Sequence, residues 1–243
     1  MPLSLSTLLV TLIFLIGIFF SLILFVFWLA NSRKDSFALY WGLGFLLWNW
    51  SQIPTMLSLS GESVVRTDFN LFFAITIPLS FLARIFIHFG LRSVLGYKNT
   101  RKVVLQFLAW FVAFILYYIY FFVVSGHASS EAVFYEMVLF FIPMSLLSMY
   151  WIIREYRKNT AYDDVKKTAF IFFILFTIAV IANYVYFIFA SYIYPIELFH
   201  VLVRASYPYL AARLASMVLL FINFILFFRL ARFKENSEKM QVQ

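Results

Sequence analysis

The chain has 243 residues, of which 64% are hydrophobic and only 12% are charged, about half the charged share of a soluble domain. Too few polar residues remain to cover a soluble protein of this length, so the composition excludes one and predicts a single membrane domain over 1–243. The net charge of +8 sits in short clusters between apolar segments, which is typical of membrane loops and excludes a nucleic-acid-binding face.

Seven apolar segments approach the roughly 20 helical residues that a bilayer core requires. They lie near 7–30, 37–59, 69–93, 103–125, 131–153, 168–191 and 207–229. The first is predicted to stay as a span, because no basic side chain precedes it and its apolar run is too long for a cleavable signal. The second is the weakest, because polar residues and Pro54 interrupt it. The sequence therefore predicts an all-α polytopic protein with seven transmembrane helices.

The distribution of basic residues predicts the orientation. Fifteen of the 19 Lys and Arg residues fall in alternate connecting segments and in the C-terminal tail. Because cytoplasmic loops carry the excess of Lys and Arg, we expect the N-terminus outside and the C-terminus inside. We expect a prokaryotic cytoplasmic membrane, with the lipid bilayer as the surrounding partner.

Arg84 is the deepest charged residue, and His88 follows it at i+4 on the same helical face. Ionisable groups at this depth are costly and are functional candidates by default. One interpretation is a buried polar cluster that binds an anion or responds to protonation. The other, which we weigh more heavily, is that Arg84 snorkels toward the inner headgroups with a partner such as Asn223.

The segment Trp48-Asn49-Trp50-Ser51-Gln52-Ile53-Pro54 places polar side chains and tryptophans away from the interfacial belt. Pro54 removes a helical hydrogen bond, so we expect a kinked helix that faces the bundle interior. Trp48, Asn49, Trp50 and Gln52 are therefore candidate ligand-binding residues. Interhelical hydrogen bonding without a ligand is an equally good interpretation.

Three further residues are singled out by their depth. Asn183 lies near the midplane of the sixth span, where it could face Asn49 and join the ligand site. Glu136 and Arg213 lie at similar depths from the outer side of the fifth and seventh spans. Opposite charges in a medium that penalises lone charges should meet directly or through water. We therefore predict a Glu136–Arg213 ion pair.

The sequence predicts no cofactor and no metal. Cysteine is absent, which removes thiolate ligands and cysteine nucleophiles. His88 is predicted on the opposite side from His127 and His200; these two, with Glu131 and Glu197, remain a weaker outer-face cation alternative. Every lysine lies in a predicted loop or the tail, which excludes a retinal Schiff base.

One part of the chain resembles a known family. The motif Tyr40-Trp41-Gly42-Leu43-Gly44-Phe45 follows a basic turn, and Phe89-Gly90-Leu91-Arg92-Ser93-Val94-Leu95-Gly96 ends the third span. With the seven-span layout, this resembles the N-terminal membrane sensor regions of bacterial histidine kinases and diguanylate cyclases. In that family the last helix continues into an output domain, whereas here only the polar segment 232–243 follows it. The resemblance therefore implies signalling through a separate partner.

These observations predict a non-enzymatic seven-helix receptor or sensor-like module. Its small-molecule or lipid ligand would bind among the second, third, sixth and seventh spans, and a cytoplasmic or membrane protein would be its partner. The alternative is a transporter, a channel or a structural subunit of a larger membrane complex. An intramembrane enzyme is disfavoured because no nucleophile–base pair is evident.

Overall fold

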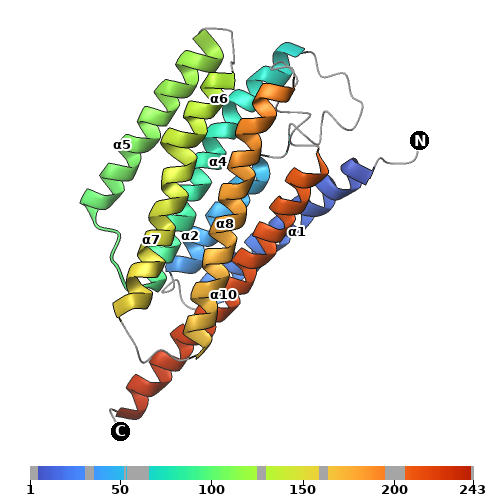
Figure 1. Ribbon diagram of the computed structural model, residues 1–243. Coiled ribbons are helices and arrows are strands. Elements are labelled where there is room, and N and C mark those ends of the chain that lie inside the picture. The colour runs from blue at the N-terminus through green and yellow to red at the C-terminus, as the bar shows by residue number, and fades with distance from the viewer. Residues whose placement is uncertain are drawn as a thin grey trace.

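A computed structural model describes residues 5–30, 36–51, 53, 66–124, 130–158, 164–194 and 206–241. Every regular element in these ranges is a helix (Figure 1). The elements are α1 (Leu5–Ala30), α2 (Ser36–Trp50), α4 (Arg66–Val94), α5 (Arg101–Tyr118), η1 (Ile119–Val124), α6 (Ser130–Glu136), η2 (Met137–Phe141), α7 (Ile142–Lys158), α8 (Asp164–Ile193) and α10 (Tyr207–Gln241). The segments α5–η1 and α6–η2–α7 each form one continuous rod, so every predicted span overlaps a helical rod.

Six of the described rods are long and apolar enough to cross a membrane, namely α1, α4, α5, α6–α7, α8 and α10. The fold is therefore an all-helical, multi-pass membrane protein, as the composition predicts. The described part of the second predicted span, α2, has 15 residues and is about 22 Å long. That is shorter than the roughly 30 Å hydrocarbon core, so a seventh crossing stays a prediction.

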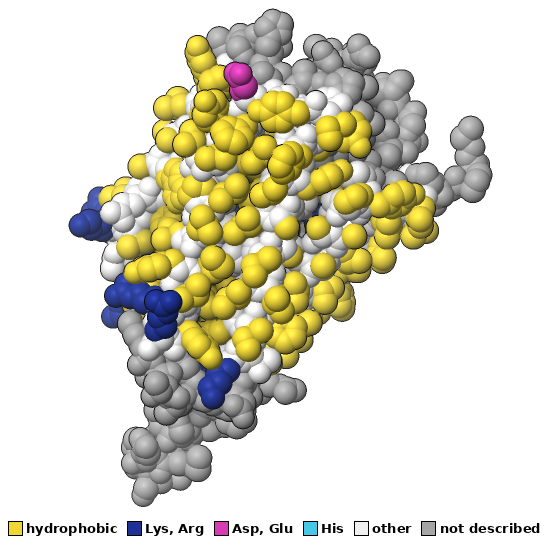
Figure 2. Space-filling view, viewed as in Figure 1, with side chains coloured by type: hydrophobic (Ala, Val, Ile, Leu, Met, Phe, Trp, Pro, Cys, Tyr) yellow, Lys and Arg dark blue, Asp and Glu magenta, His cyan; other side chains and the backbone are white. Residues whose placement is uncertain are grey.

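The outer surface of the bundle suits a lipid environment. Apolar side chains cover the visible flank, while the Lys and Arg side chains in view gather at one end (Figure 2). Exposed leucines, valines and phenylalanines recur along α1 and α5, at Leu8, Leu12, Leu15, Phe19, Leu22, Leu105, Leu108, Val112 and Leu116. Lipid tails can cover this surface at no hydrophobic cost.

Contacts between neighbouring helices join α1 to α2, α2 to α4, α4 to α7, α7 to α8, α8 to α10 and α10 back to α1. Helix α5 packs on α4 at the edge of the bundle (Figure 1). Helices α2 and α4 pack closely, with the ring of Trp41 directly on Gly90. The indole Nε1 of Trp41 donates a hydrogen bond to the carbonyl of Ile87 at 2.8 Å. The two motifs that carry the family resemblance thus form a helix-packing interface.

Two irregularities shape the part of the interior that lies away from the basic end of the bundle. Pro78 lies inside α4, where its missing N–H interrupts the helical ladder. In the α6–α7 rod, the π-helical turn η2 precedes Pro143, and an inserted π turn accommodates the bond that this proline cannot donate. Glu136, Met137 and Phe141 flank or form this turn and line a cavity.

Helix α10 is longer than the membrane requires. Its 35 residues extend about 52 Å at the α-helical rise, and its C-terminal end projects past the other helices (Figure 1). The sequence predicts a short polar tail from residue 232. The structure instead continues α10 as a helix to Gln241.

Candidate functional site

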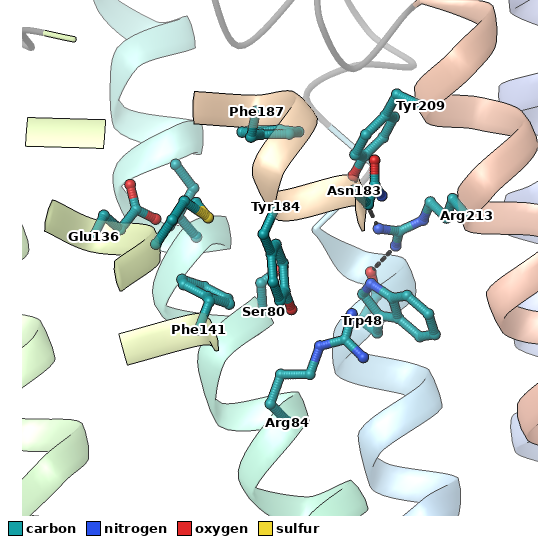
Figure 3. Close-up of a pocket in the computed structure, with 12 residues that line it drawn as sticks. Trp48, Ser80, Arg84, Glu136, Phe141, Asn183, Tyr184, Phe187, Tyr209 and Arg213 are labelled. Carbon is teal, nitrogen blue, oxygen red and sulfur yellow. Dashed lines mark hydrogen bonds between the residues drawn. The ribbon is translucent and has the colours of Figure 1, made fainter. Parts of the chain in front are cut away.

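A cavity of about 510 Å³ lies between α2, α4, the α6–η2 turn, α8 and α10 (Figure 3). That volume includes space that is open to the outside; the part that water-sized atoms can occupy is about 40 Å³, the size of a few water molecules. It sits toward the helix ends that lie opposite the basic cluster, because Trp48 is near the end of α2 and Tyr209 near the start of α10. Its lining residues are Trp48, Ile77, Ser80, Arg84, Glu136, Met137, Phe141, Asn183, Tyr184, Phe187, Tyr209 and Arg213.

Trp48 is the centre of the charged part of this cavity. The guanidinium carbon of Arg84 lies 4.3 Å from the centroid of its ring, and that of Arg213 lies 4.8 Å from it. Both distances are typical of cation–π contacts, which are strongest with tryptophan. One indole therefore holds two buried arginines together in an environment that screens their charges poorly.

Arg213 is fixed by neutral acceptors. Its Nη1 donates to the hydroxyl of Tyr209 at 3.1 Å, and its Nη2 donates to the carbonyl of Trp48. That carbonyl belongs to the last turn of α2, where helical carbonyls lack intrahelical partners and carry partial negative charge. The end of α2 thus explains why a charged side chain from α10 is tolerated here.

Arg84 does not snorkel. Its side chain is 8% exposed, and its guanidinium points toward Trp48 and the cavity (Figure 3). Its other aromatic contacts are Tyr184 at 5.7 Å and Phe176 at 5.9 Å. Asn223, the suggested partner, donates instead to the carbonyl of Leu219 on its own helix. The interpretation of Arg84 as a snorkelling residue is therefore wrong.

The cavity wall also contains polar atoms without hydrogen bonds. The hydroxyl of Tyr184 and Oδ1 of Asn183 are buried and have no hydrogen-bond partner among the described residues. Buried polar atoms are almost always satisfied in folded proteins. Ser80 adds a further hydroxyl to the same wall. Oδ1 of Asn183 is an acceptor, whereas the two hydroxyls can donate as well as accept and the arginines only donate.

Glu136 and Arg213 line the same cavity, as their depths suggest, but they do not meet. Figure 3 shows their side chains on opposite sides, with Tyr184 between them. The direct contact is therefore replaced by the bonds of Arg213 to Trp48 and Tyr209. Equal depth does not make the fifth and seventh spans neighbours. A link through water stays a prediction.

Other predicted site residues lie outside this cavity. Asn49 is fully buried against Gly17 of α1 and donates to the carbonyl of Phe45, so it neither lines the cavity nor faces Asn183. The side chain of Trp50 is 45% exposed. Gln52 and Pro54 lie outside the described residues, and the kink therefore stays a prediction.

His88 lies deeper in the bundle, beyond a second cavity that shares Arg84 with the first. This second space of about 270 Å³ is bordered by Ser145, Ser148 and Thr177. Nδ1 of His88 is 2.8 Å from the hydroxyl of Ser148, while Nε2 is buried without a hydrogen-bond partner among the described residues. Arg84 therefore stands between the two cavities.

Tyr184, Tyr209 and Ser80 are site residues that the sequence patterns do not single out. Two weak signals are present: Tyr209 lies one helical turn before Arg213, and Tyr184 follows Asn183. These signals have little power, because the chain contains 15 tyrosines and neither signal separates these two from the others.

Within the described ranges, no three His, Asp or Glu side chains come together as a metal site. His127, His200 and Glu197, from the alternative cation site, lie outside those ranges, and Glu131 alone of that set is described. The chain matches no protein-family model, no curated protein and no solved structure. Its function must therefore be argued from the site.

Proposed function

We propose that this chain is a seven-helix receptor or sensor-like module of a cytoplasmic membrane, with its N-terminus outside and its C-terminus inside. The cavity around Trp48 is its ligand site, and the response passes to a separate protein at the inner end. The observation that carries the proposal is a cavity lined by five packed rods, with two buried arginines in its wall. Concave spaces with apolar walls and a few convergent polar groups are typical of ligand sites.

The helices offer a route from this cavity to the inner end. α4, α7, α8 and α10 each contribute to the cavity or its neighbour and then continue to the basic end of the bundle. A ligand that binds one arrangement of these helices more tightly shifts the protein toward it. The projecting end of α10 is a suitable surface for a partner, as the resemblance to bacterial sensor regions implies.

Transport is the second candidate function, and the second cavity favours it. Arg84 borders both spaces, and hydroxyl groups continue from it toward His88. A transporter needs polar groups along such an interior path. A receptor needs only the outer cavity.

One experiment tests the ligand site and identifies its ligand together. The full chain is extracted with its native lipids into polymer discs, and bound small molecules and lipids are identified by mass spectrometry. Trp48→Leu is the cavity variant, and the exposed Trp50→Leu is its matched control. We expect a stoichiometric compound in the unaltered protein and in Trp50→Leu that is depleted in Trp48→Leu. Equal recovery from all three proteins would contradict the proposal.

The same compound then separates reception from transport. Proteoliposomes that contain the purified chain are loaded on one side only. Binding without flux supports the receptor, whereas flux that disappears in Trp48→Leu supports the transporter.

A further inference from the structure

Arg84 is a buried charge without a described ionic partner. It is more than nine-tenths buried, and no described carboxylate pairs with it. The hydroxyl of Tyr184 forms no hydrogen bond of normal geometry; it interacts with the guanidinium, but a hydroxyl carries no charge to balance it. Aromatic faces attract the guanidinium but supply no lone-pair acceptor for its five N–H donors. A buried charge in this state normally finds a partner.

The missing partner must be a hydrogen-bond acceptor that carries a negative charge. Around the space into which Arg84 points stand the hydroxyls of Ser80 and Tyr184 and the amide of Asn183. Hydroxyls and amides can all donate to an anion, and a flip of the amide exchanges its oxygen and nitrogen. A planar guanidinium matches carboxylate and phosphate oxygens by paired hydrogen bonds.

The carboxylate already in the cavity does not fill this role. Glu136 lies on the far side, with the rings of Phe141 and Tyr184 between it and Arg84 (Figure 3). The cavity is lined by two arginines and one carboxylate, which leaves one positive charge unbalanced. The anion-binding region is therefore the part between Arg84, Trp48 and Asn183.

We infer that this region binds a carboxylate or phosphate group, with Arg84 as its main charge partner. The inference rests on the proposed function insofar as it uses the same cavity. The apolar part of the wall, formed by Ile77, Met137 and Phe187, accommodates the uncharged remainder of the ligand. Two sources supply this chemistry: a soluble anion and the headgroup of an anionic lipid.

The test uses the full chain in nanodiscs of zwitterionic phosphatidylcholine. Acetate and inorganic phosphate are titrated at constant ionic strength, with tetramethylammonium as the cation control, and binding is read from the melting temperature. A parallel set of discs contains phosphatidylglycerol. Arg84→Gln removes the charge and Arg84→Lys keeps it. Arg154→Gln is the matched control, because Arg154 also lies over a tryptophan ring but is exposed.

We expect saturable stabilisation by an anion and none by tetramethylammonium. Arg84→Gln weakens anion affinity about 10- to 100-fold, the effect of a lost charge-assisted hydrogen bond. Arg84→Lys retains part of the affinity, and Arg154→Gln all of it. Stabilisation by soluble anions identifies a soluble ligand, and stabilisation by phosphatidylglycerol alone identifies a headgroup.

Three results would overturn the inference. In the first, neither the soluble anions nor phosphatidylglycerol stabilises the unaltered protein. In the second, Arg84→Gln binds as tightly as the unaltered protein. A folding defect is recognised separately: without anion, Arg84→Gln should melt at or above the unaltered protein, because an uncompensated buried charge is removed. Lower stability of Arg84→Gln, with Arg84→Lys restoring it, would show that Arg84 is paired within the chain and would also refute the inference. Anion binding without any response at the inner end would reject the receptor but keep the anion site.

Discussion

The contact between Trp41 and Gly90 gives the most quantitative prediction about the bundle. A Cβ atom added at Gly90 would lie 2.3 Å from Cδ1 and 2.6 Å from Nε1 of the Trp41 ring. The ring is fully buried and rigid, and its Nε1 is held by the carbonyl of Ile87. Gly90→Ala must therefore displace the indole or separate α2 from α4.

The cost follows from three contributions. Overpacking a core costs about 1–3 kcal/mol, and loss of a buried hydrogen bond about 1–3 kcal/mol. The higher helix propensity of alanine returns about 1 kcal/mol. Together these contributions predict that Gly90→Ala lowers the free energy of unfolding by about 1–5 kcal/mol, measured by reversible denaturation in detergent micelles.

Gly42→Ala is the matched control on α2. Its added Cβ would lie 3.1 Å from the ring of Phe25, which is only half-buried and can shift. We expect a change within about 1 kcal/mol. Equal stability of the two variants would refute the packing argument. So would a Gly90→Ala/Trp41→Phe double variant whose loss equals the sum of the single losses, because residues in contact should not behave additively.

Three further predictions concern other parts of the chain. Ser148→Ala removes the partner of His88 Nδ1 and should lower the free energy of unfolding by about 1–3 kcal/mol. Ser145→Ala is the control and should cost clearly less, because the hydroxyl of Ser145 bonds a carbonyl of its own helical rod. The reverse order would contradict the role of His88. Tyr97→Phe removes a 2.9 Å hydrogen bond to Glu155 and should lower the melting temperature through a loss of about 1 kcal/mol; an unchanged temperature would show that this contact between the segment after α4 and α7 contributes nothing. Because the chain lacks cysteine, a single cysteine placed at the C-terminus should react with an impermeant thiol reagent only from the inner side; labelling from outside would reject the proposed topology.

The fold can be predicted from sequence because apolar run length and charge clustering act locally. The predicted depth of a residue in the membrane also indicates which residues line the interior. Trp48, Arg84, Glu136, Asn183 and Arg213 are all polar or aromatic residues predicted inside the membrane, and all line one cavity. The physical reason is that lipid penalises such side chains on the outer surface, so they converge on the interior.

Which face each residue occupies cannot be predicted in the same way. Trp48, Asn49 and Trp50 form a cluster in sequence, but successive helical residues are rotated by about 100°. They consequently point to the cavity, to α1 and to the outside of the bundle. Nothing in the sequence indicates that Asn49 packs on Gly17, and this contact removes it from the ligand site.

The sequence also does not indicate which helices are neighbours in the bundle. Glu136 and Arg213 have matching depths, yet other side chains separate them across the cavity (Figure 3). The partner that Arg213 actually uses is the carbonyl of Trp48, a buried backbone acceptor in the last turn of α2, where carbonyls lack helical partners. Single-sequence patterns contain neither the order of helices around a bundle nor the place where a helix stops.

The central claim, that the cavity is positively charged and accepts anions, is tested most directly by the reactivity of a cysteine within it. Ser80 lines the cavity and is partly exposed, and Ser80→Cys would be the only thiol in the chain. Its reaction rates with a negatively charged and a positively charged methanethiosulfonate of similar size are compared in nanodiscs. One excess positive charge nearby should favour the anionic reagent about tenfold or more, and Arg84→Gln should remove that preference. Equal rates, or a faster reaction with the cationic reagent, would contradict a positively charged cavity.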